Sequence, residues 1–154
     1  MFSSKLKHAS AVAALTMFAV AMLAVPAPAT APTHKNVHFT ATVTGAAIGR
    51  NQAAFKIHDS VSGNGAGVQT LLSVSATRGT DITTTYYGNA SVVTRDTFTL
   101  SAPDSRGIIT VTGRGHDIRG TGRFRHLRGS YTYTGTYDPK TTRTLVRLTG
   151  TESY

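Results

Sequence analysis

Apolar and polar residues alternate one by one along much of the chain, and this pattern restricts the fold more than any other feature. At the first such segment, Val37, Phe39, Ala41 and Val43 alternate with His38, Thr40, Thr42 and Thr44. A period of two places one set of side chains on each face of a β-strand, whereas a helix needs apolar residues three and four positions apart. No window of about eleven residues in the rest of the chain after Thr30 holds the helical pattern. The sequence therefore predicts a protein in which helix is a minor component.

The same pattern predicts about eight strands. They lie near residues 37–43, 53–58, 68–77, 82–87, 91–100, 107–113, 130–137 and 144–151. Turn signals separate them at residues 63–67, 78–81, 102–105 and 138–140. This spacing favours antiparallel hairpins, and eight such strands close into a barrel that has no exposed edge. We predict an all-β fold, an antiparallel β-barrel of about eight strands. A two-sheet sandwich has the same periodicity and stays open as an alternative.

The first 29 residues have the three parts of a secretory signal peptide. Lys5 and Lys7 give a basic start, a largely apolar run follows over residues 11–25, and small residues stand at Ala27 and Ala29. The run is shorter than the roughly twenty residues that cross a bilayer. We therefore predict cleavage after Ala29 and a secreted protein without a transmembrane segment. A retained N-terminal anchor is the alternative.

The mature chain from Thr30 is expected to form one domain. Residues 30–36 are predicted to be a flexible segment and residues 37–154 to be the barrel. Cysteine is absent, which excludes disulfides, thiolate metal sites and a cysteine nucleophile. Once the two leader lysines are removed, fourteen of the sixteen Lys and Arg residues oppose seven acids, which gives a formal charge of +7. This charge favours an anionic polymer or cell surface as a partner.

Glycines, arginines and tyrosines dominate the segment GTGRFRHLRGSYTYTGTY, residues 120–137. Gly120 and Gly122 lack the third glycine of a dinucleotide-binding fingerprint, and Gly129 is not followed by the Lys-Ser/Thr of a nucleotide-binding loop. The segment also leads into a strand, not into a helix whose N-terminus binds phosphate. A nucleotide site is therefore not predicted, and no cofactor is predicted.

The order DIRGTGRFRHLRGSYTYTGTY resembles the Gly-Thr-Gly-x-Phe-x-x-x-x-Gly stretch of the allene oxide cyclase and dirigent-like β-barrels. The positions of that stretch are filled by Gly120, Thr121, Gly122, Phe124 and Gly129. The preceding APDSRGIITVTGRG is similar to the strand that comes before this turn in the family, so the resemblance covers about residues 102–137. It implies an eight-stranded barrel with a partly apolar lumen. It also implies that the glycines form a structural turn with Phe124 as its aromatic anchor.

The chain departs from the catalytic members of this family. The plant cyclases are associated with a buried acidic residue and a cysteine near the pocket, but this chain has no cysteine, and its single glutamate is Glu152. Dirigent proteins are associated with pocket aspartates and an arginine, to which Asp59, Asp81, Asp96 and Asp104 are not aligned. No catalytic residue is carried over from the resemblance.

Acid–base, metal and serine chemistry find weak support in the sequence. The seven acids are scattered singly, five of them beside or within turn signals, and are predicted to be solvated turn caps. His58-Asp59 and His116-Asp117 each place the acid next in sequence, so that on a strand the two side chains point to opposite faces. No Gly-x-Ser-x-Gly motif occurs. We predict no metal site.

Tyrosines share one face of the strand near residues 130–137. Tyr131, Tyr133 and Tyr137 lie on this face with Gly135, and Ser130 and three threonines lie on the other. Ordinary core packing is the favoured interpretation. The alternative is that these three tyrosines, together with Tyr86, line a ligand-binding lumen.

Basic residues are concentrated in residues 114–128. The group consists of Arg114, His116, Arg119, Arg123, Arg125, His126 and Arg128, opposed only by Asp117. A solvated rim is the favoured interpretation, and the alternative is that the five arginines bind an anionic surface or polymer. Specific nucleic-acid recognition is not predicted.

Taken together, these features predict a secreted barrel that binds a small apolar ligand in its lumen, and they favour a binding protein over an enzyme. The first alternative is a cofactor-free cyclase or isomerase acting on an apolar substrate. The second is a polyanion-binding or cell-surface-binding protein that uses the basic residues 114–128. A buried polar group that converges on a lumen favours the enzyme, and a fully packed interior favours the polyanion-binding protein.

Overall fold

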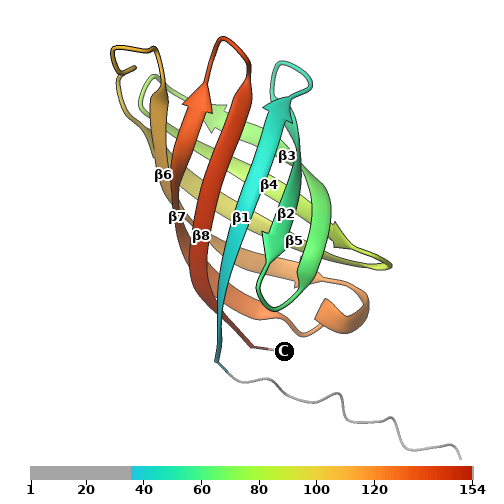
Figure 1. The fold of residues 1–154 in the computed structure, drawn as a ribbon. Helices are drawn as coiled ribbons and strands as arrows, with labels where there is room; N and C mark the ends of the chain where they lie inside the picture. Colours follow the sequence, from blue (N-terminus) through green and yellow to red (C-terminus); the bar gives the residue numbers. More distant parts are fainter. Residues whose placement is uncertain (1–35, 154) are drawn as a thin grey trace, which may run out of the picture. The chain divides into compact units, whose positions relative to one another are not determined.

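The computed structural model describes residues 36–153, which form a closed barrel of eight antiparallel strands (Figure 1). The strands are β1 (Val37–Ala47), β2 (Gln52–Asp59), β3 (Gly63–Val74), β4 (Arg78–Tyr87), β5 (Ala90–Leu100), β6 (Ile109–Gly120), β7 (Arg128–Asp138) and β8 (Arg143–Ser153). One turn of 3₁₀ helix, η1 (Gly122–Phe124), lies between β6 and β7. Each strand pairs with the next in sequence, and β8 pairs with β1. The prediction of an eight-stranded antiparallel barrel is confirmed, and the sandwich alternative is excluded.

The predicted signal peptide, and all of the predicted flexible segment except Asn36, lie outside the described residues.

Within the barrel, the alternation in the sequence becomes an alternation between interior and exterior. Along β7, Tyr131 and Tyr133 are partly buried, while Thr132 and Thr134 are exposed. Because successive side chains of a strand point to opposite faces, one set lines the interior of the barrel and the other faces solvent.

Two of the predicted turns, at residues 63–67 and 78–81, are wrong, because these residues belong to β3 and β4. Their glycines provide space for aromatic rings. A Cβ atom on Gly67 would contact the ring of Phe55, and one on Gly79 would contact the ring of Phe98. The chain actually turns at residues 60–62 and 75–77. Glycine in these strands therefore indicates close packing in the interior.

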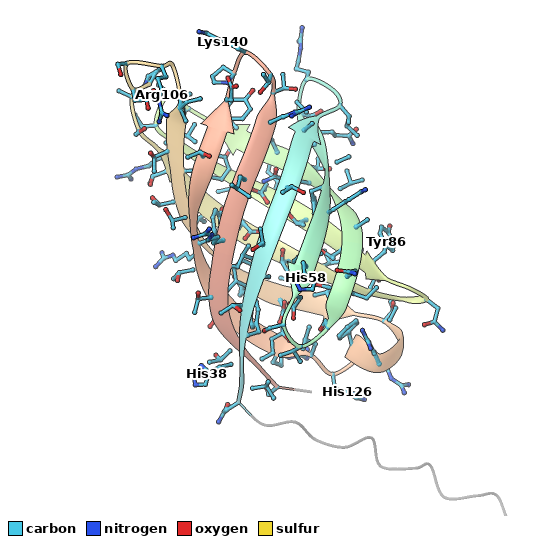
Figure 2. The ribbon with its side chains drawn as sticks, viewed as in Figure 1. His38, His58, Tyr86, Arg106, His126 and Lys140 are labelled. Carbon is cyan, nitrogen blue, oxygen red and sulfur yellow. The ribbon has the colours of Figure 1, made fainter. Side chains whose placement is uncertain are left out.

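The two ends of the barrel differ. At one end, the connection between β6 and β7 folds back as η1 and buries Phe124 and Leu127, which are 2% and 1% exposed. These side chains pack against Ala90 and Val92 of β5, with Tyr87 beside them. The other end carries the hairpin turns that include Arg106 and Lys140 (Figure 2). The segment around η1 is therefore a plug that covers one end of the barrel.

Candidate functional site

A cavity of about 370 Å³ lies inside the barrel, lined by residues from all eight strands. Its apolar lining includes Phe39, Val43, Phe55, Ile57, Leu71, Phe98, Leu100, Val111, Val146 and Leu148. The volume falls within the range of about 300–1,000 Å³ that is usual for small-molecule sites. The barrel therefore has a lumen large enough for a small ligand.

Three of the four candidate tyrosines line this lumen. Tyr131, Tyr133 and Tyr137 are part of its wall. Tyr86 is not, because it lies on the outward face of β4 and is 55% exposed. Its neighbour Tyr87 points inward instead and lines the cavity. In β4, Gly79 faces the interior next to the ring of Phe98. Every second residue after it, up to Tyr87, faces the interior as well.

Five of the seven acids lie in the interior and not at solvated turns, which corrects the sequence-based prediction. They are Asp59, Asp81, Asp96, Asp117 and Glu152. Asp59, Asp81 and Asp96 are 3%, 0% and 4% exposed. The prediction failed because residues 78–81 continue a strand, and strand alternation then directs Asp81 inward.

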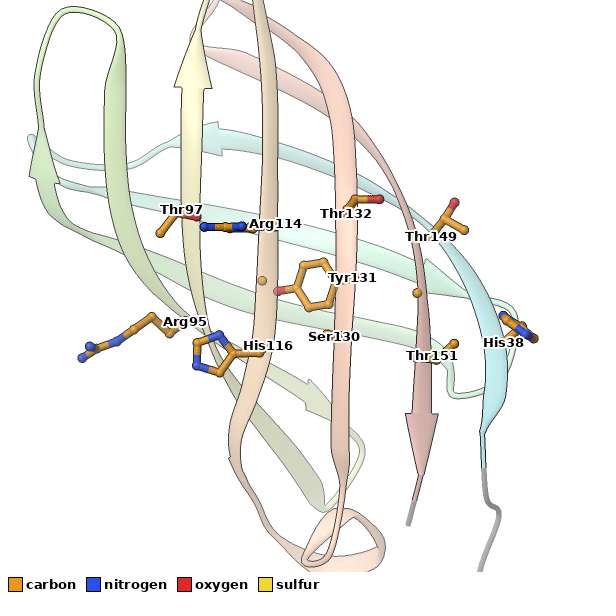
Figure 3. A pocket seen from close by; sticks show the side chains of 12 residues that line it. His38, Arg95, Thr97, Arg114, His116, Ser130, Tyr131, Thr132, Thr149 and Thr151 are labelled. Atoms are coloured by element: carbon orange, nitrogen blue, oxygen red, sulfur yellow. The ribbon is translucent and has the colours of Figure 1, made fainter.

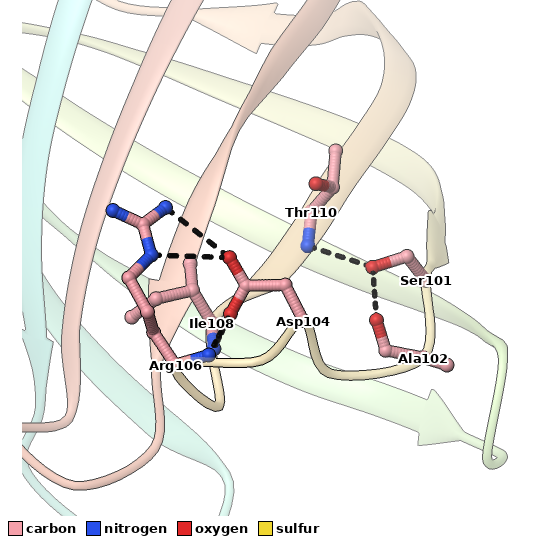
Figure 4. A network of polar contacts seen from close by, with 6 residues as sticks. All are labelled: Ser101, Ala102, Asp104, Arg106, Ile108 and Thr110. Atoms are coloured by element: carbon pink, nitrogen blue, oxygen red, sulfur yellow. Dashed lines mark hydrogen bonds and ion pairs between the residues drawn. The ribbon is translucent and has the colours of Figure 1, made fainter.

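The two remaining acids are solvated turn caps, as predicted. Asp59 also caps a turn, because it accepts from the backbone N–H groups of Val61 and Ser62 at 2.7 and 2.8 Å, but it is buried. Asp104 accepts hydrogen bonds from the backbone N–H groups of Arg106 and Ile108, at 2.9 and 2.8 Å (Figure 4). Asp138 accepts one from the backbone N–H of Lys140. Hydrogen bonds to the ionised form hold the pKa of both carboxyls below the ordinary value. The largest contribution comes from the backbone N–H of Ile108 for Asp104 and from the hydroxyl of Thr141 for Asp138.

Asp81 and Asp96 form a carboxyl pair in the interior. They occupy directly opposite positions on β4 and β5. Gln69 Nε2 donates to Asp81 Oδ2 at 2.8 Å, and the hydroxyl of Thr83 donates to Asp81 Oδ1 at 3.2 Å. The Tyr131 hydroxyl donates to Asp96 Oδ1 at 2.8 Å, and the Thr94 hydroxyl donates to Asp96 Oδ2 at 3.0 Å. Asp96 and Tyr131 also line the lumen, so the pair is connected to it.

Burial changes the acidity of this pair. Loss of solvation raises the pKa of both carboxyls, and the negative charge of Asp81 contributes to raising the pKa of Asp96 to about 7. Burial, and then the charge of Asp96, also raise the pKa of the Tyr131 hydroxyl well above its ordinary value. Asp96 is therefore able to give or accept a proton near neutral pH, while Tyr131 stays protonated.

A second acidic group lies in the interior near the plugged end. Asp117 Oδ2 and Glu152 Oε2 are buried and have no hydrogen-bond partner in the described part of the chain. Gly129 lies between them, since a Cβ atom there would meet Asp117 Oδ2 at 2.6 Å and Glu152 Cγ at 3.1 Å. Burial raises the pKa of Asp117 to about 6. Burial and the charges of Asp59 and Asp117 raise that of Glu152 to about 8.

Tyr87 borders this second group. Burial, with the negative charges of Asp59 and Glu152, raises the pKa of its hydroxyl above the ordinary value.

Sequence reasoning missed both acidic groups, although a signal was present. In β5, Val92, Thr94, Asp96 and Phe98 follow one another at a spacing of two and therefore share a face. An acid in such a series points in the same direction as its apolar neighbours.

The glycines assigned to a structural turn occupy the corner before β7. Gly122 has a φ angle of +57°, a conformation that favours glycine. A Cβ atom on Gly120 would instead collide with the backbone carbonyl of Phe124, so that position is restricted by a close approach and not by its backbone angles. Phe124 is the buried anchor of the corner, and Gly129 makes room for Asp117.

The five candidate arginines do not form one cluster. Arg123 Nη2 donates to the backbone carbonyl of Ser62 at 3.0 Å, and its guanidinium lies 4.7 Å from the centre of the Phe124 ring. Arg128 Nη1 donates to the carbonyl of Leu127 at 2.7 Å. Arg119 and Arg125 are exposed near the plug, and Arg114 lies farther along β6, opposite Thr97 and Thr132. Two of the five thus stabilise the plug.

Between residues 36 and 153 no three His, Asp or Glu side chains are arranged to hold a metal ion. None of the helical segments in that range is long and apolar enough to cross a membrane. Comparisons of the chain with family models, with curated proteins and with solved structures gave no match.

Proposed function

We propose that the protein binds a small, mainly apolar ligand in the lumen of the barrel. The observation that carries this proposal is the cavity of about 370 Å³, whose walls are mostly aliphatic and aromatic. A site of this kind gains affinity from apolar burial and specificity from a few polar groups. Polar groups that line this cavity include Asp59, Asp117 and Glu152 near the plugged end and, on β5 and β7, the carboxyl of Asp96 and the hydroxyls of Tyr131 and Tyr133.

The protonation of these groups determines which ligands fit. Near neutral pH the Asp96 carboxyl exists partly in its neutral form and both tyrosines are protonated. A neutral carboxyl and a hydroxyl donate hydrogen bonds without the cost of burying a charge. They suit a ligand with a carbonyl, ether or hydroxyl oxygen on an apolar skeleton.

Binding is tested with an apolar dye whose fluorescence rises in a dry site, and with two tyrosine variants. Tyr133→Ala removes a ring from the lumen wall, whereas Tyr86→Ala removes the same group from the outer face. We expect wild type and Tyr86→Ala to bind the dye equally and Tyr133→Ala to change its affinity by about tenfold, since removing a buried ring changes the contact area. No dye binding by wild type, or equal effects of the two variants, would contradict the proposal.

A second candidate function is a cofactor-free isomerase or cyclase. The observation that favours it is the Asp96–Tyr131 pair, in which a carboxyl with a pKa of about 7 is hydrogen bonded to a hydroxyl at the wall of the cavity. Such a carboxyl can donate a proton to a bound substrate and take one back from it. The chemistry fits a reaction in which a double bond or ring is rearranged without a change in oxidation state.

Solvent deuterium distinguishes this enzyme from a binding protein. A ligand extracted from the purified protein is returned to it in deuterated water and analysed by mass spectrometry. If Asp96 moves protons to and from carbon, wild type incorporates deuterium into the ligand and Asp96→Asn does not. Binding of the ligand without any deuterium uptake would leave the binding function standing and contradict the enzyme.

A further inference from the structure

The charges of the barrel are divided between its inside and its outside. Five acids point inward, and the other two, Asp104 and Asp138, are at the turns of the unplugged end. Arginine and lysine side chains, in contrast, are exposed along the strands. The outer wall between the two ends therefore carries positive charges, and among the described residues no carboxylate there neutralises them.

Two grooves on this outer wall meet at Arg114. The first, of about 650 Å³, crosses β5, β6, β7, β8 and β1 and contains Arg95, Arg114 and His116 (Figure 3). The second, of about 850 Å³, reaches Arg78 on β4. The residues common to both are Thr97, Arg114 and Thr132. We call the combined surface the arginine trough.

The three arginines of the trough lie in successive cross-strand rows. Arg95 is opposite His116, Arg114 is opposite Thr97, and Arg78 is opposite Thr99. Along a strand, rows that face the same way are about 6.7 Å apart. The arginines therefore recur at intervals of several Å along the surface, and this spacing suits a ligand with regularly spaced charges.

The remaining side chains of the trough are mostly hydroxyls. The serines and threonines are Ser73, Ser75, Thr80, Thr97, Thr99, Thr112, Ser130, Thr132, Thr149 and Thr151, and the others are His38, Val74, Phe98, Tyr131 and Tyr133. Tyr131 and Tyr133 line both the trough and the lumen, and the Tyr131 hydroxyl bonds Asp96 on the lumen side. Phe98 is buried, with 8% of its surface exposed. Apart from the imidazoles of His38 and His116, no aromatic side chain among the described residues of the trough is exposed, so the trough offers little surface for stacking on nucleobases. This argues against single-stranded nucleic acid.

We propose that the arginine trough binds a linear polymer of phosphate groups that carries no bases. Arginine forms paired hydrogen bonds with phosphate oxygens, and serine and threonine hydroxyls donate to the same oxygens. The site lies on the outer wall and is separate from the lumen. It also differs from the basic segment 114–128, because of the seven basic residues in that segment only Arg114 and His116 lie in the trough.

The test is a salt titration of binding to long-chain inorganic polyphosphate. If three arginines each release about 0.7–0.9 of a counterion, log affinity falls with log salt with a slope of about −2 to −3. Arg95→Gln/Arg114→Gln is expected to flatten the slope by about 1.5 and to weaken binding about tenfold or more at low salt. Both side chains are exposed, so the double variant should melt at the wild-type temperature.

Two matched variants locate the site. Lys140→Gln/Arg143→Gln removes the same charge at the unplugged end, and Arg119→Gln/Arg125→Gln removes it near the plug. Both are expected to keep the wild-type slope to within about half a unit. An equal loss in either one, or identical slopes for wild type and the trough variant, would overturn the proposed site.

Heparin and single-stranded DNA complete the comparison. Polyphosphate is expected to bind more tightly than either at the same charge concentration and salt. Tighter binding of heparin would assign the trough to sulfated polysaccharides instead, and tighter binding of DNA would assign it to nucleic acid, so each result would overturn the phosphate polymer. The apolar dye should still bind the lumen of the trough variant, which keeps this test independent of the lumen proposal.

Discussion

Asp81 and Asp96 face each other across β4 and β5 inside the barrel, and each carboxylate accepts its hydrogen bonds from different neighbours. Two carboxylates so close together and so little solvated cannot both ionise easily. The barrel therefore contains a carboxyl pair whose proton content changes near neutral pH. This pair connects the stability of the fold to the chemistry of the lumen.

The first prediction is that the free energy of unfolding falls as pH rises from about 4 to about 8. Asp96, Asp117 and Glu152 have folded-state pKa values of about 7, 6 and 8, all above their unfolded values. In this window the folded state binds more protons than the unfolded state, so raising the pH favours unfolding. The summed loss should reach several kcal/mol, and it is measured by urea unfolding at a series of pH values.

Asp96→Asn should make this dependence weaker, because the amide cannot ionise while its oxygen can still accept from Tyr131. Asp104→Asn is the control. The pKa of Asp104 is lowered, so its titration lies below the window and the slope should stay as in wild type. A stability that rises with pH through this range would contradict the inward placement of the acids.

The second prediction concerns the corner before β7. Gly120→Ala places a Cβ against the backbone carbonyl of Phe124 and should lower stability by about 1–3 kcal/mol. Gly49→Ala is the matched control, since a Cβ there meets nothing within 4 Å, and its effect should stay within about 0.5 kcal/mol. Thermal melting of both variants gives the comparison. Equal melting temperatures would show that the corner can relax around the new methyl group.

The third prediction is that the plug is a major source of stability. Phe124→Ala removes a side chain that is 2% exposed and packs against Ala90, Val92, Leu127 and Tyr87. Loss of a buried phenylalanine costs about 3–5 kcal/mol. Ile118→Ala, at a residue that is 43% exposed, should cost less than about 1 kcal/mol. Similar losses in the two variants would mean that the plug closes the barrel without holding it together.

The number and order of the strands could be predicted from the sequence because the alternation of Val37, Phe39, Ala41 and Val43 is a local signal. The same periodicity also allows a two-sheet sandwich, so the sequence predicts the barrel without excluding that alternative. Strand ends were predicted less well. The sequence pattern assigns Gly65, Gly67 and Gly79 to turns, but in the structure each makes space for an aromatic ring of another residue.

The lumen was predicted only in part. Tyr131, Tyr133 and Tyr137 could be placed on one face from spacing alone, but the pairing of Asp81 with Asp96 depends on the register of two strands. Register is set by packing and turns along the whole sheet, which single-residue patterns do not contain. The arginine trough could not be predicted for the same reason, since Arg78, Arg95 and Arg114 come from three strands and meet only through their register.

The last prediction concerns Glu152, whose Oε2 is buried without a hydrogen-bond partner among residues 36–153. Burial and the charges of Asp59 and Asp117 raise its pKa to about 8. Above that pH the folded state must carry this charge near two others, at a cost that the unfolded chain avoids. Glu152→Gln should therefore raise stability at pH 9 by on the order of 1 kcal/mol and have little effect near pH 5, where Glu152 is already neutral.

Asp138→Asn serves as the comparison for this variant. Asp138 is partly exposed at a turn and accepts hydrogen bonds from Lys140 and Thr141, and its pKa is lowered. Removing its charge should not stabilise the protein at pH 9, because the ionised form is the one that the turn favours. If Glu152→Gln proved less stable than wild type at pH 9, the ionised Glu152 would have to be stabilised by a partner inside the lumen, and the carboxylate would become a candidate ligand-binding group in its own right.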